Sequence, residues 1–346
     1  MGERTRVAVL EAPRRFRVVE RPKPTPGRGE VVVRVAATAI CHTDLEIYTG
    51  RHPGVRYPVV MGHEATGVVE AVGPEVAMVA PGHRVLINPI MSCGTCDCCL
   101  RGQDNICRRA GLFGREVDGS LAGHVLVPER NVHALPDHLP LPAATLIETL
   151  ATVRHAQDRV GITAGQSVVV LGQGATGLLH TQLAGLSGGA PVIAVSRSRW
   201  KLDLARRMRA DHVVDAARND LVAEVLRLTG GRGADVAIDT AGSPELIGRA
   251  IEMLGPGGRL LLYAVSNRPL PEFTTFPVYY KELTLYGSRA FQARDFEPAI
   301  CLAASGAIDL EGFITASYPF ERVAAALADY ERDPGRVLRT VIVGEG

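Results

Sequence analysis

The sequence lacks the features that mark several large classes of protein. Its 346 residues include 38 Lys and Arg against 37 Asp and Glu, so the formal net charge is +1 and no excess of either sign indicates a nucleic-acid partner or an acidic tail. No segment approaches the roughly 20 consecutive apolar residues of a membrane span. The first residues, MGERTRVAVLEAPRRF, contain no apolar run long enough for a secretory signal. We therefore expect a cytoplasmic globular protein without nucleic-acid or membrane partners.

Cysteine is scarce outside one short stretch. Five of the seven cysteines fall in MSCGTCDCCLRGQDNIC, residues 91 to 107. A chain long enough for about two domains needs no disulfide staples, and thiols stay reduced in the cytoplasm. Cys93, Cys96, Cys99 and Cys107 follow the spacing C-x2-C-x2-C-x7-C, which predicts a closed, structural zinc site with no position open for catalysis. Cys98 is left unligated, because adjacent residues in an extended stretch point opposite ways.

The pattern of expected secondary structure changes near residue 160. Residues 6 to 90 contain short β-rich runs separated by Gly and Pro, which predict a small antiparallel or barrel-like unit. Apolar strands then alternate with helix-length segments, which predicts βαβ units and a doubly wound parallel sheet. A last helix and a last β run are expected to return to the first unit. We expect a β-rich catalytic domain over residues 1–150 and a nucleotide-binding domain over residues 151–287. Residues 288–346 are expected to belong to the catalytic domain again.

The first unit also holds a second set of possible metal ligands. Cys41 lies in AICHTDLEIY, His63 and Glu64 lie in VVMGHEATGVV, and Glu148 lies in the apolar segment LIETLATVRHA. Alone, each cysteine or histidine is more often a core or hydrogen-bonded residue than a ligand. Together with Glu148 they are harder to dismiss, because a buried carboxylate needs a cation or hydrogen-bond donors.

In these motifs the chain resembles the zinc-dependent medium-chain alcohol and polyol dehydrogenases, over nearly its whole length. The matching motifs, in order, are Cys41-x-Thr43-Asp44, Gly62-His63-Glu64, the four-cysteine lobe, the segment from Glu148 to His155, a Gly-rich turn and the closing GRVLRTVIV. The resemblance implies a GroES-like catalytic domain and a Rossmann domain. It also implies that Cys41 and His63 bind a catalytic zinc, with Glu148 at the third ligand position and Glu64 beside the metal. Whether Glu64 or Glu148 binds the zinc directly stays open.

A zinc ion with three protein ligands keeps a fourth position for an oxygen whose pKa it lowers. The resemblance places Thr43 where the family takes the proton from the alcohol. Glu46 stands where a histidine commonly passes that proton on, and it is either an acceptor in the relay or a polar wall of the pocket. His42 faces either the cofactor phosphates or solvent.

A Gly-rich turn predicts a dinucleotide site. SVVVLGQGATGLLHTQLAG places Gly172, Gly174 and Gly177 as G-x-G-x-x-G between a strand and a helix, with Ala175 and Thr176 inside the motif. A turn of this kind that binds nothing is the plainer alternative. The glycines allow a tight turn and close approach of the backbone to a pyrophosphate at the helix N-terminus.

The second strand of this domain bears on the choice of cofactor. No acidic residue occurs from 172 to 202, and the strand PVIAVS ends in Ser196, followed by Arg197 and Arg199. An acidic residue there would hold the ribose hydroxyls of NAD(H), whereas arginine and serine suit a 2'-phosphate. We therefore favour NADP(H) over NAD(H), although the arginines could also be solvated surface charges. By resemblance, Thr152 lies near the nicotinamide and Arg339 contacts the cofactor phosphates.

The sequence thus predicts a homo-oligomeric oxidoreductase, a tetramer or a dimer, that binds two zinc ions per subunit. It would transfer hydride between a secondary alcohol or polyol and NADP(H), with the ketone as the substrate of the reverse reaction, and the physiological direction is not evident from the sequence. The alternatives are use of NAD(H), a primary alcohol and aldehyde pair, a non-zinc quinone or enoyl reductase of the same fold, and a zinc-ribbon binding module. The substrate itself is not evident from the sequence.

Overall fold

The computed structural model describes residues 2–270 and 273–344, and the chain divides into two units. Unit 1 comprises residues 1–149 and 292–346, and unit 2 comprises residues 150–291. The sequence placed the corresponding boundaries after residues 150 and 287. No helix of the described residues is both long enough and apolar enough to cross a membrane.

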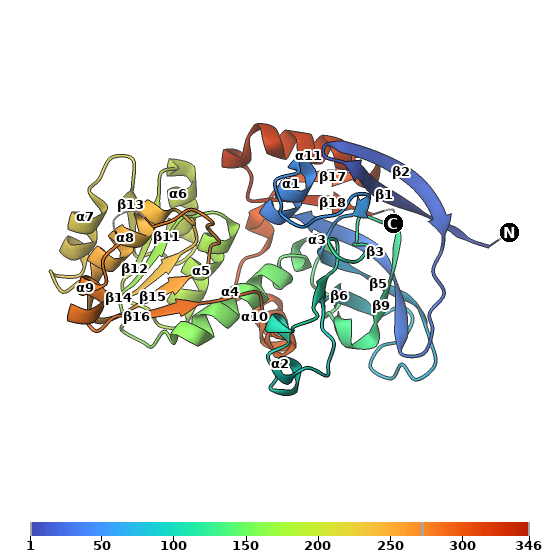
Figure 1. The fold of residues 1–346 in the computed structure, drawn as a ribbon, viewed down its shortest axis with the longest axis horizontal. Helices are drawn as coiled ribbons and strands as arrows, with labels where there is room; N and C mark the ends of the chain where they lie inside the picture. Colours follow the sequence, from blue (N-terminus) through green and yellow to red (C-terminus); the bar gives the residue numbers. More distant parts are fainter. Residues whose placement is uncertain (1, 271–272, 345–346) are drawn as a thin grey trace. The chain divides into compact units, whose positions relative to one another are not determined.

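Unit 1 is built on β-sheets that bring the two ends of the chain together. Its seven-stranded sheet runs β10-β6-β5-β3-β18-β17, with β9 also paired to β3, and a second sheet runs β2-β1-β4 (Figure 1). The apolar run TVIV near the end of the sequence forms β18, which pairs antiparallel with β3 so that Thr340 faces Ile40. The strands are β1 (Arg4–Ala12), β2 (Arg15–Pro22), β3 (Glu30–Ile40), β4 (Val59–Val60), β5 (Glu64–Val72), β6 (Arg84–Ile87), β7 (Ile90–Met91), β8 (Gly111–Leu112), β9 (His124–Pro128), β10 (Val132–Ala134), β17 (Ile314–Pro319) and β18 (Arg339–Val343).

The helices of unit 1 are α1 (His42–Thr49), α2 (Asp97–Leu100), α3 (Leu141–Ala144), α10 (Phe296–Ala304) and α11 (Val323–Arg332). Helix α4 (Ile147–Val160) begins in unit 1 and continues into unit 2. Helix α1 starts directly after the central strand β3, so side chains of its first turn lie at the end of that strand. Gly50 ends α1 in the left-handed conformation, with φ of 78°.

Unit 2 contains a parallel sheet in the order β13-β12-β11-β14-β15-β16. Numbered within the unit, this is the order 3-2-1-4-5-6 of dinucleotide-binding domains. Its strands are β11 (Val168–Leu171), β12 (Val192–Ser196), β13 (His212–Asp215), β14 (Ala234–Asp239), β15 (Leu254–Leu262) and β16 (Thr284–Gly287). Its other helices are α5 (Ala175–Leu186), α6 (Arg199–Arg207), α7 (Leu221–Leu228), α8 (Pro244–Met253) and α9 (Phe276–Tyr280). The predicted combination of a β-rich domain and a doubly wound parallel sheet is confirmed.

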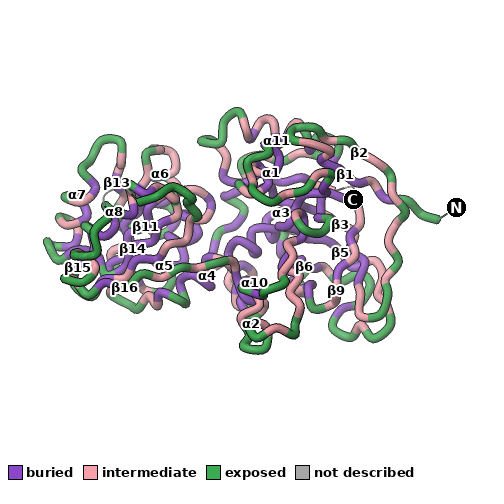
Figure 2. The backbone as a smooth tube through the Cα atoms, in the orientation of Figure 1, coloured by how far each residue is buried: buried purple, intermediate pink, exposed green. Residues whose placement is uncertain are grey.

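The inner strands β11 and β12 of unit 2 are buried on both faces, as their near-continuous apolar sequences require (Figure 2), whereas the edge strand β16 is largely exposed. Val169 and Leu171 pack with side chains of α7 and α8, whereas Val168 and Val170 pack with side chains of α4 and α5. This alternation fixes the sheet between two layers of helices. Its carboxyl-terminal edge is where ligands bind in folds of this kind.

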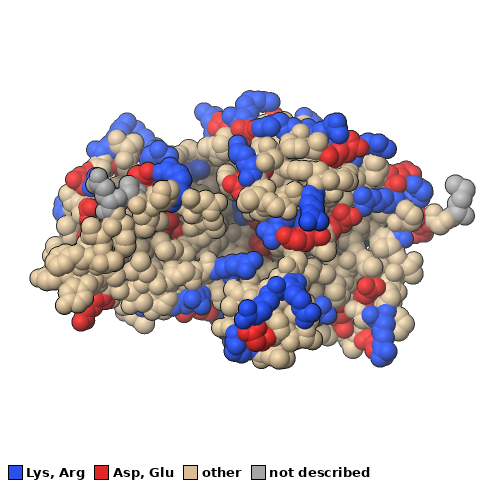
Figure 3. Space-filling model, viewed as in Figure 1, with Lys and Arg blue, Asp and Glu red and all other residues tan. Residues whose placement is uncertain are grey.

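Charge is distributed without a large region of one sign on the visible face. Lys and Arg side chains there lie interspersed with Asp and Glu (Figure 3). Many are paired across short distances, as in the ion pair of Arg14 with Glu331 at 2.6 Å.

Candidate active site

Three possible metal ligands meet at the end of the central strand of unit 1. Cys41 follows β3 and precedes α1, while His63 and Glu64 lie at the start of β5, which pairs with β3 so that Ala39 faces Glu64. One ligand atom from each of these three buried residues lies within 4.8 Å of the others, and the distance from Cys41 Sγ to His63 Nε2 is 3.1 Å. The residue before His63 must be glycine. Gly62 has φ of 96°, and a Cβ atom there would lie 2.7 Å from Ser120 Oγ.

Asp44 completes this arrangement, and the sequence reasoning did not include it among the site residues. It is fully buried, and its Oδ2 accepts a hydrogen bond from the backbone N–H of Cys41 at 3.0 Å. Its Oδ1 lies 3.5 Å from His63 Nδ1. Burial, the largest contribution, opposes ionisation, but His63 and the hydrogen bonds outweigh it and lower the pKa of Asp44. A carboxylate on Nδ1 leaves Nε2 for a metal, as second-sphere partners of zinc histidines do.

A buried ion pair joins the last strand to this group. Arg339 Nη2 donates to Glu64 Oε1 at 2.9 Å and to Thr149 Oγ1 at 2.7 Å, and the Arg339 and Glu64 side chains are only 7% and 3% exposed. The sequence assigned Arg339 to the cofactor phosphates, whereas its observed partners are Glu64 and Thr149. Among the described residues, no hydrogen-bond partner is found for Arg339 Nε or Glu64 Oε2.

Glu148 lies outside the closest group of three but belongs to the same electrostatic environment. Burial, with a smaller contribution from the charge of Glu64, raises the pKa of Glu148 to about 8. Burial also raises the pKa of the Cys41 thiol. Arg339 pairs with only one of the two carboxylates, so the thiol, the imidazole and the second carboxylate, all shielded from water, would be costly to keep together without a further cation. This donor set therefore fits a catalytic zinc, with Cys41, His63 and one of the two glutamates as ligands.

The residues expected to move the proton lie on the first turns of α1. Thr43 is half-buried two residues after Cys41. Glu46 and His42 lie one helical turn apart, with Glu46 Oε1 3.9 Å from His42 Nε2, and their side chains are 40% and 69% exposed. The structure therefore brings His42 and Glu46 together at the surface and leaves Thr43 half-buried in the first turn of α1, close in sequence to Cys41.

The cysteine lobe gathers four sulfur atoms. Cys93, Cys96, Cys99 and Cys107 have Sγ atoms within 4.8 Å of one another, and neighbouring pairs are 3.5, 3.6, 3.9 and 4.0 Å apart. A tetrahedron of Zn–S bonds of about 2.3 Å has edges of about 3.8 Å. All four thiols are free rather than bridged. The lobe therefore fits a zinc ion held by four thiolates, and Cys98 is not part of the four-sulfur group.

The Gly-rich turn lies between β11 and α5 in unit 2. Gly172 has φ of 96°, and a Cβ atom on Gly177 would lie 2.0 Å from the Gly172 carbonyl oxygen, so both positions require glycine. A Cβ atom on Gly174 would meet nothing within 4 Å, which leaves open space beside the turn. Ala175 and Thr176 form the first turn of α5, whose backbone N–H groups have no helical partner. The turn therefore fits the pyrophosphate of a dinucleotide.

The end of β12 carries the residues expected to choose between the two cofactors. Ser196 Oγ accepts a hydrogen bond from the Ser198 N–H at 3.1 Å. Arg197 and Arg199 are exposed, and no ion pair joins either to a carboxylate within the described part of the chain. Asp215, which the sequence reasoning missed, ends the neighbouring strand directly opposite Ser196. It was missed because it follows Ser196 by a whole helix, so only the order of the strands brings it close.

Thr152 lies on α4 in unit 2. Its Oγ1 is 2.6 Å from the hydroxyl of Tyr263, which follows β15. This hydroxyl pair therefore involves the residue that directly follows the carboxyl end of β15, and hydroxyl groups can hydrogen-bond to a ribose or an amide.

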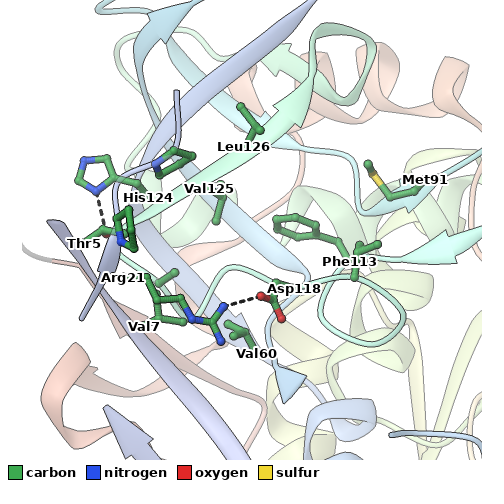
Figure 4. A pocket seen from close by; sticks show the side chains of 15 residues that line it. Thr5, Val7, Arg21, Val60, Met91, Phe113, Asp118, His124, Val125 and Leu126 are labelled. Atoms are coloured by element: carbon green, nitrogen blue, oxygen red, sulfur yellow. Dashed lines mark hydrogen bonds and ion pairs between the residues drawn. The ribbon is translucent and has the colours of Figure 1, made fainter. Parts of the chain in front are cut away.

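A separate hollow of about 370 Å³ lies on unit 1 between the first two strands and β9 (Figure 4). Its lining is mainly apolar, with Phe113 and Val125 among the side chains, and the ion pair of Arg21 with Asp118 at 2.6 Å borders it. None of the candidate metal ligands lines this hollow, so we do not assign it to the substrate.

Comparisons with known proteins identify the relatives of the chain. Residues 27–137 match the family described as alcohol dehydrogenase GroES-like domain, and residues 175–305 match the zinc-binding dehydrogenase family. L-threonine 3-dehydrogenase of Pyrococcus furiosus is 35% identical over 308 residues, which cover 87% of each chain. Sorbitol dehydrogenase of Halalkalibacterium halodurans is 32% identical, over 88% of this chain and 89% of the relative.

Two solved structures are similar over almost the whole chain. The rspB alcohol dehydrogenase of Escherichia coli CFT073, complexed with NADH, has a TM-score of 0.92 and 30% identity and covers 99% of this chain and 100% of its own. A zinc-binding dehydrogenase of Sinorhizobium meliloti 1021, bound to NADP, has a TM-score of 0.90 and 30% identity and covers 99% of both chains. The two similar structures therefore contain different nicotinamide cofactors.

Proposed function

Because the chain belongs to the zinc-dependent medium-chain alcohol dehydrogenase family and is thus an NAD(P)-dependent oxidoreductase, we propose that it interconverts a secondary alcohol or polyol and the corresponding ketone. The observation that carries this proposal is the buried group of Cys41, His63 and Glu64. The names of two relatives, L-threonine 3-dehydrogenase and sorbitol dehydrogenase, support this substrate class. Family membership sets aside the zinc-ribbon module.

The residues of the metal group have separate roles in this proposal. Cys41, His63 and a glutamate would hold zinc, which when bound supplies the Lewis acidity that polarises the substrate oxygen. Asp44 fixes the ring of His63 through Nδ1. The Thr43 hydroxyl would take the proton of the alcohol while it releases its own proton to Glu46, and Glu46 would pass that proton to solvent at the exposed side of α1. Four thiolates in the cysteine lobe would hold a second zinc ion that has no part in the reaction.

We propose NADP(H) as the preferred cofactor. Arg197 and Arg199 are exposed without carboxylate partners among the described residues, so their guanidinium groups are available to a 2'-phosphate. Asp215 beside Ser196 acts against this preference, because its charge repels a phosphate. We therefore propose that the attraction of the 2'-phosphate to Arg197 and Arg199 exceeds its repulsion by Asp215.

We propose that the protein is a homo-oligomer, at least a dimer. Strand β16 is the last strand of its sheet, and large apolar side chains lie exposed on it and on α9: Leu285 at 39%, Phe276 at 65%, Tyr279 at 80% and Tyr280 at 73%. Two copies of a free strand edge can pair, and burying the aromatic cluster would favour such a contact. The mass of the protein in solution tests this, and a monomer at micromolar concentration would contradict it.

The substrate class is tested with a panel of secondary alcohols, polyols and primary alcohols. Turnover is measured from the absorbance of the reduced nicotinamide, with NAD(H) and with NADP(H). We expect turnover of secondary alcohols or polyols and two zinc ions per subunit. Cys41→Ser should abolish turnover, whereas the matched variant Cys98→Ser should retain it. Preference for primary alcohols would support the alternative substrate class, and full activity of Cys41→Ser would overturn the proposed metal site.

A further inference from the structure

The hydroxyl of Thr240 lies directly beneath the Gly-rich turn. Thr240 follows β14, whose last residue, Asp239, faces Leu171 at the end of β11. The Thr240 N–H donates to the Leu171 carbonyl at 2.9 Å, and its single hydroxyl hydrogen is shared between the carbonyls of Leu171, 2.9 Å from Oγ1, and Gly172, 3.1 Å from Oγ1. A residue that directly follows a different strand therefore holds the first peptide of the turn.

The positions of the glycines show how closely this hydroxyl fits. A Cβ atom on Gly172 would lie 2.8 Å from Thr240 Oγ1, and one on Gly177 would lie 2.9 Å from the same atom. The hydroxyl thus occupies the space that two glycines leave free. Glycine at both positions is needed partly because Thr240 is there.

The side chain of Gln173 provides a second set of hydrogen bonds that holds the Gly-rich turn. Gln173 is buried, and its side chain donates to the Val170 carbonyl at 3.1 Å and accepts from Thr181 Oγ1 at 3.1 Å. Asp239 fixes the segment that carries Thr240, because its Oδ1 accepts hydrogen bonds from the N–H groups of Ala241 at 3.0 Å and Gly242 at 3.2 Å.

We propose that Thr240 is a positioning residue for the pyrophosphate of the cofactor, an inference that rests on the dinucleotide binding proposed above. A peptide unit is planar and trans, so its C=O and N–H point in opposite directions. The hydroxyl that holds the Gly172 carbonyl therefore also aims the N–H of Gln173, in the same peptide, away from Thr240. Without it the peptide can rotate, and the anion site must be ordered when the cofactor binds.

The test compares Thr240→Val, which keeps the shape of the side chain, with Thr240→Ser, which keeps the hydroxyl. Thr229→Val is the control, because the hydroxyl of Thr229 in unit 2 likewise lies within hydrogen-bond distance of two carbonyls, at 2.8 and 3.2 Å, but at the end of α7. Thr229 is buried, whereas Thr240 is half-buried. Binding of ADP-ribose and of adenosine is measured by the fluorescence of the single tryptophan, Trp200, on α6. The KM for the cofactor and kcat are measured with the same proteins.

We expect Thr240→Val to weaken ADP-ribose binding and raise the cofactor KM by about tenfold, with kcat, zinc content and adenosine binding unchanged. Thr240→Ser should restore both values, and Thr229→Val should lower the melting temperature without changing them. Unchanged ADP-ribose binding in Thr240→Val, or an equal loss in Thr240→Ser, would overturn the inference. If the valine variant does not fold, Thr240→Ala gives the same comparison.

Failure of the proposed function is distinguishable from failure of this inference. If the unmodified protein binds neither ADP-ribose nor a nicotinamide cofactor, both are wrong. If it binds them and Thr240→Val binds them equally well, only the inference is wrong.

Discussion

Replacing Asp44 by Asn gives the sharpest test of the metal group. The amide has nearly the same size as the carboxylate. In the unmodified protein the Cys41 N–H donates to Asp44 Oδ2 at 3.0 Å, and the amide oxygen of the variant can still accept this hydrogen bond. What the variant removes is the negative charge 3.5 Å from His63 Nδ1. The change therefore acts on the orientation and basicity of the histidine rather than on packing.

The expected size of the effect follows from the burial of the pair. Removing a second-sphere partner of a zinc histidine typically costs 10- to 100-fold in metal affinity or activity, or about 1.4 to 2.8 kcal/mol. Asp44 is 0% and His63 is 6% exposed, so water cannot replace the carboxylate at Nδ1. We therefore expect a loss toward the upper end of this range.

The assay follows the release of zinc to a chromogenic chelator, together with kcat for the best alcohol. The zinc proposed for the cysteine lobe would serve as an internal reference, because Asp44→Asn should leave the affinity of the lobe for zinc unchanged. Asp97→Asn is the control, since that carboxylate is 44% exposed and pairs with arginines of the lobe. If Asp44→Asn keeps both zinc ions and kcat within twofold of the unmodified protein, the assigned role of Asp44 is wrong.

Four further changes probe other parts of the protein. Cys107→Ser should lower the melting temperature more than Cys98→Ser, because it opens a closed site that contributes to folding; the reverse order would exclude the assigned lobe. Thr43→Val should reduce alcohol oxidation by about a hundredfold at constant zinc content, and a small loss would mean that water carries the proton. Ser196→Asp should raise the KM for NADP(H) and improve use of NAD(H), because the new charge repels only the phosphorylated cofactor; an unmodified enzyme that already prefers NAD(H) would contradict the cofactor proposal. Burial lowers the pKa of His133 to about 4, so the folded protein excludes a proton that the unfolded chain binds below about pH 6.5. Stability should therefore fall as the pH is lowered, by about 2 kcal/mol at pH 5 from this group, and urea unfolding of His133→Phe should show a decline smaller by that amount.

Short-range sequence patterns were sufficient to predict the family, the two kinds of domain and the enzyme class. The cysteine lobe spans residues 93 to 107, and the Gly-rich turn spans residues 172 to 177, so their spacing alone limits what each can form. Local geometry dictates such motifs, because glycine at φ of 96° and ligands a few residues apart leave few alternatives. The assignments of individual site residues and the preference for NADP(H) remain predictions.

The partners of the site residues depended on contacts that no local pattern contains. Arg339 meets Glu64 across 275 residues, because β18 inserts beside β3 in the sheet of unit 1. Asp215 lies opposite Ser196 only because β13 pairs with β12, and Thr240 reaches Gly172 only because β14 pairs with β11. The sequence specifies which segments become strands, but the order and register of the strands are set by the collective burial of their apolar faces. Which polar side chains then share a site is a consequence of that order.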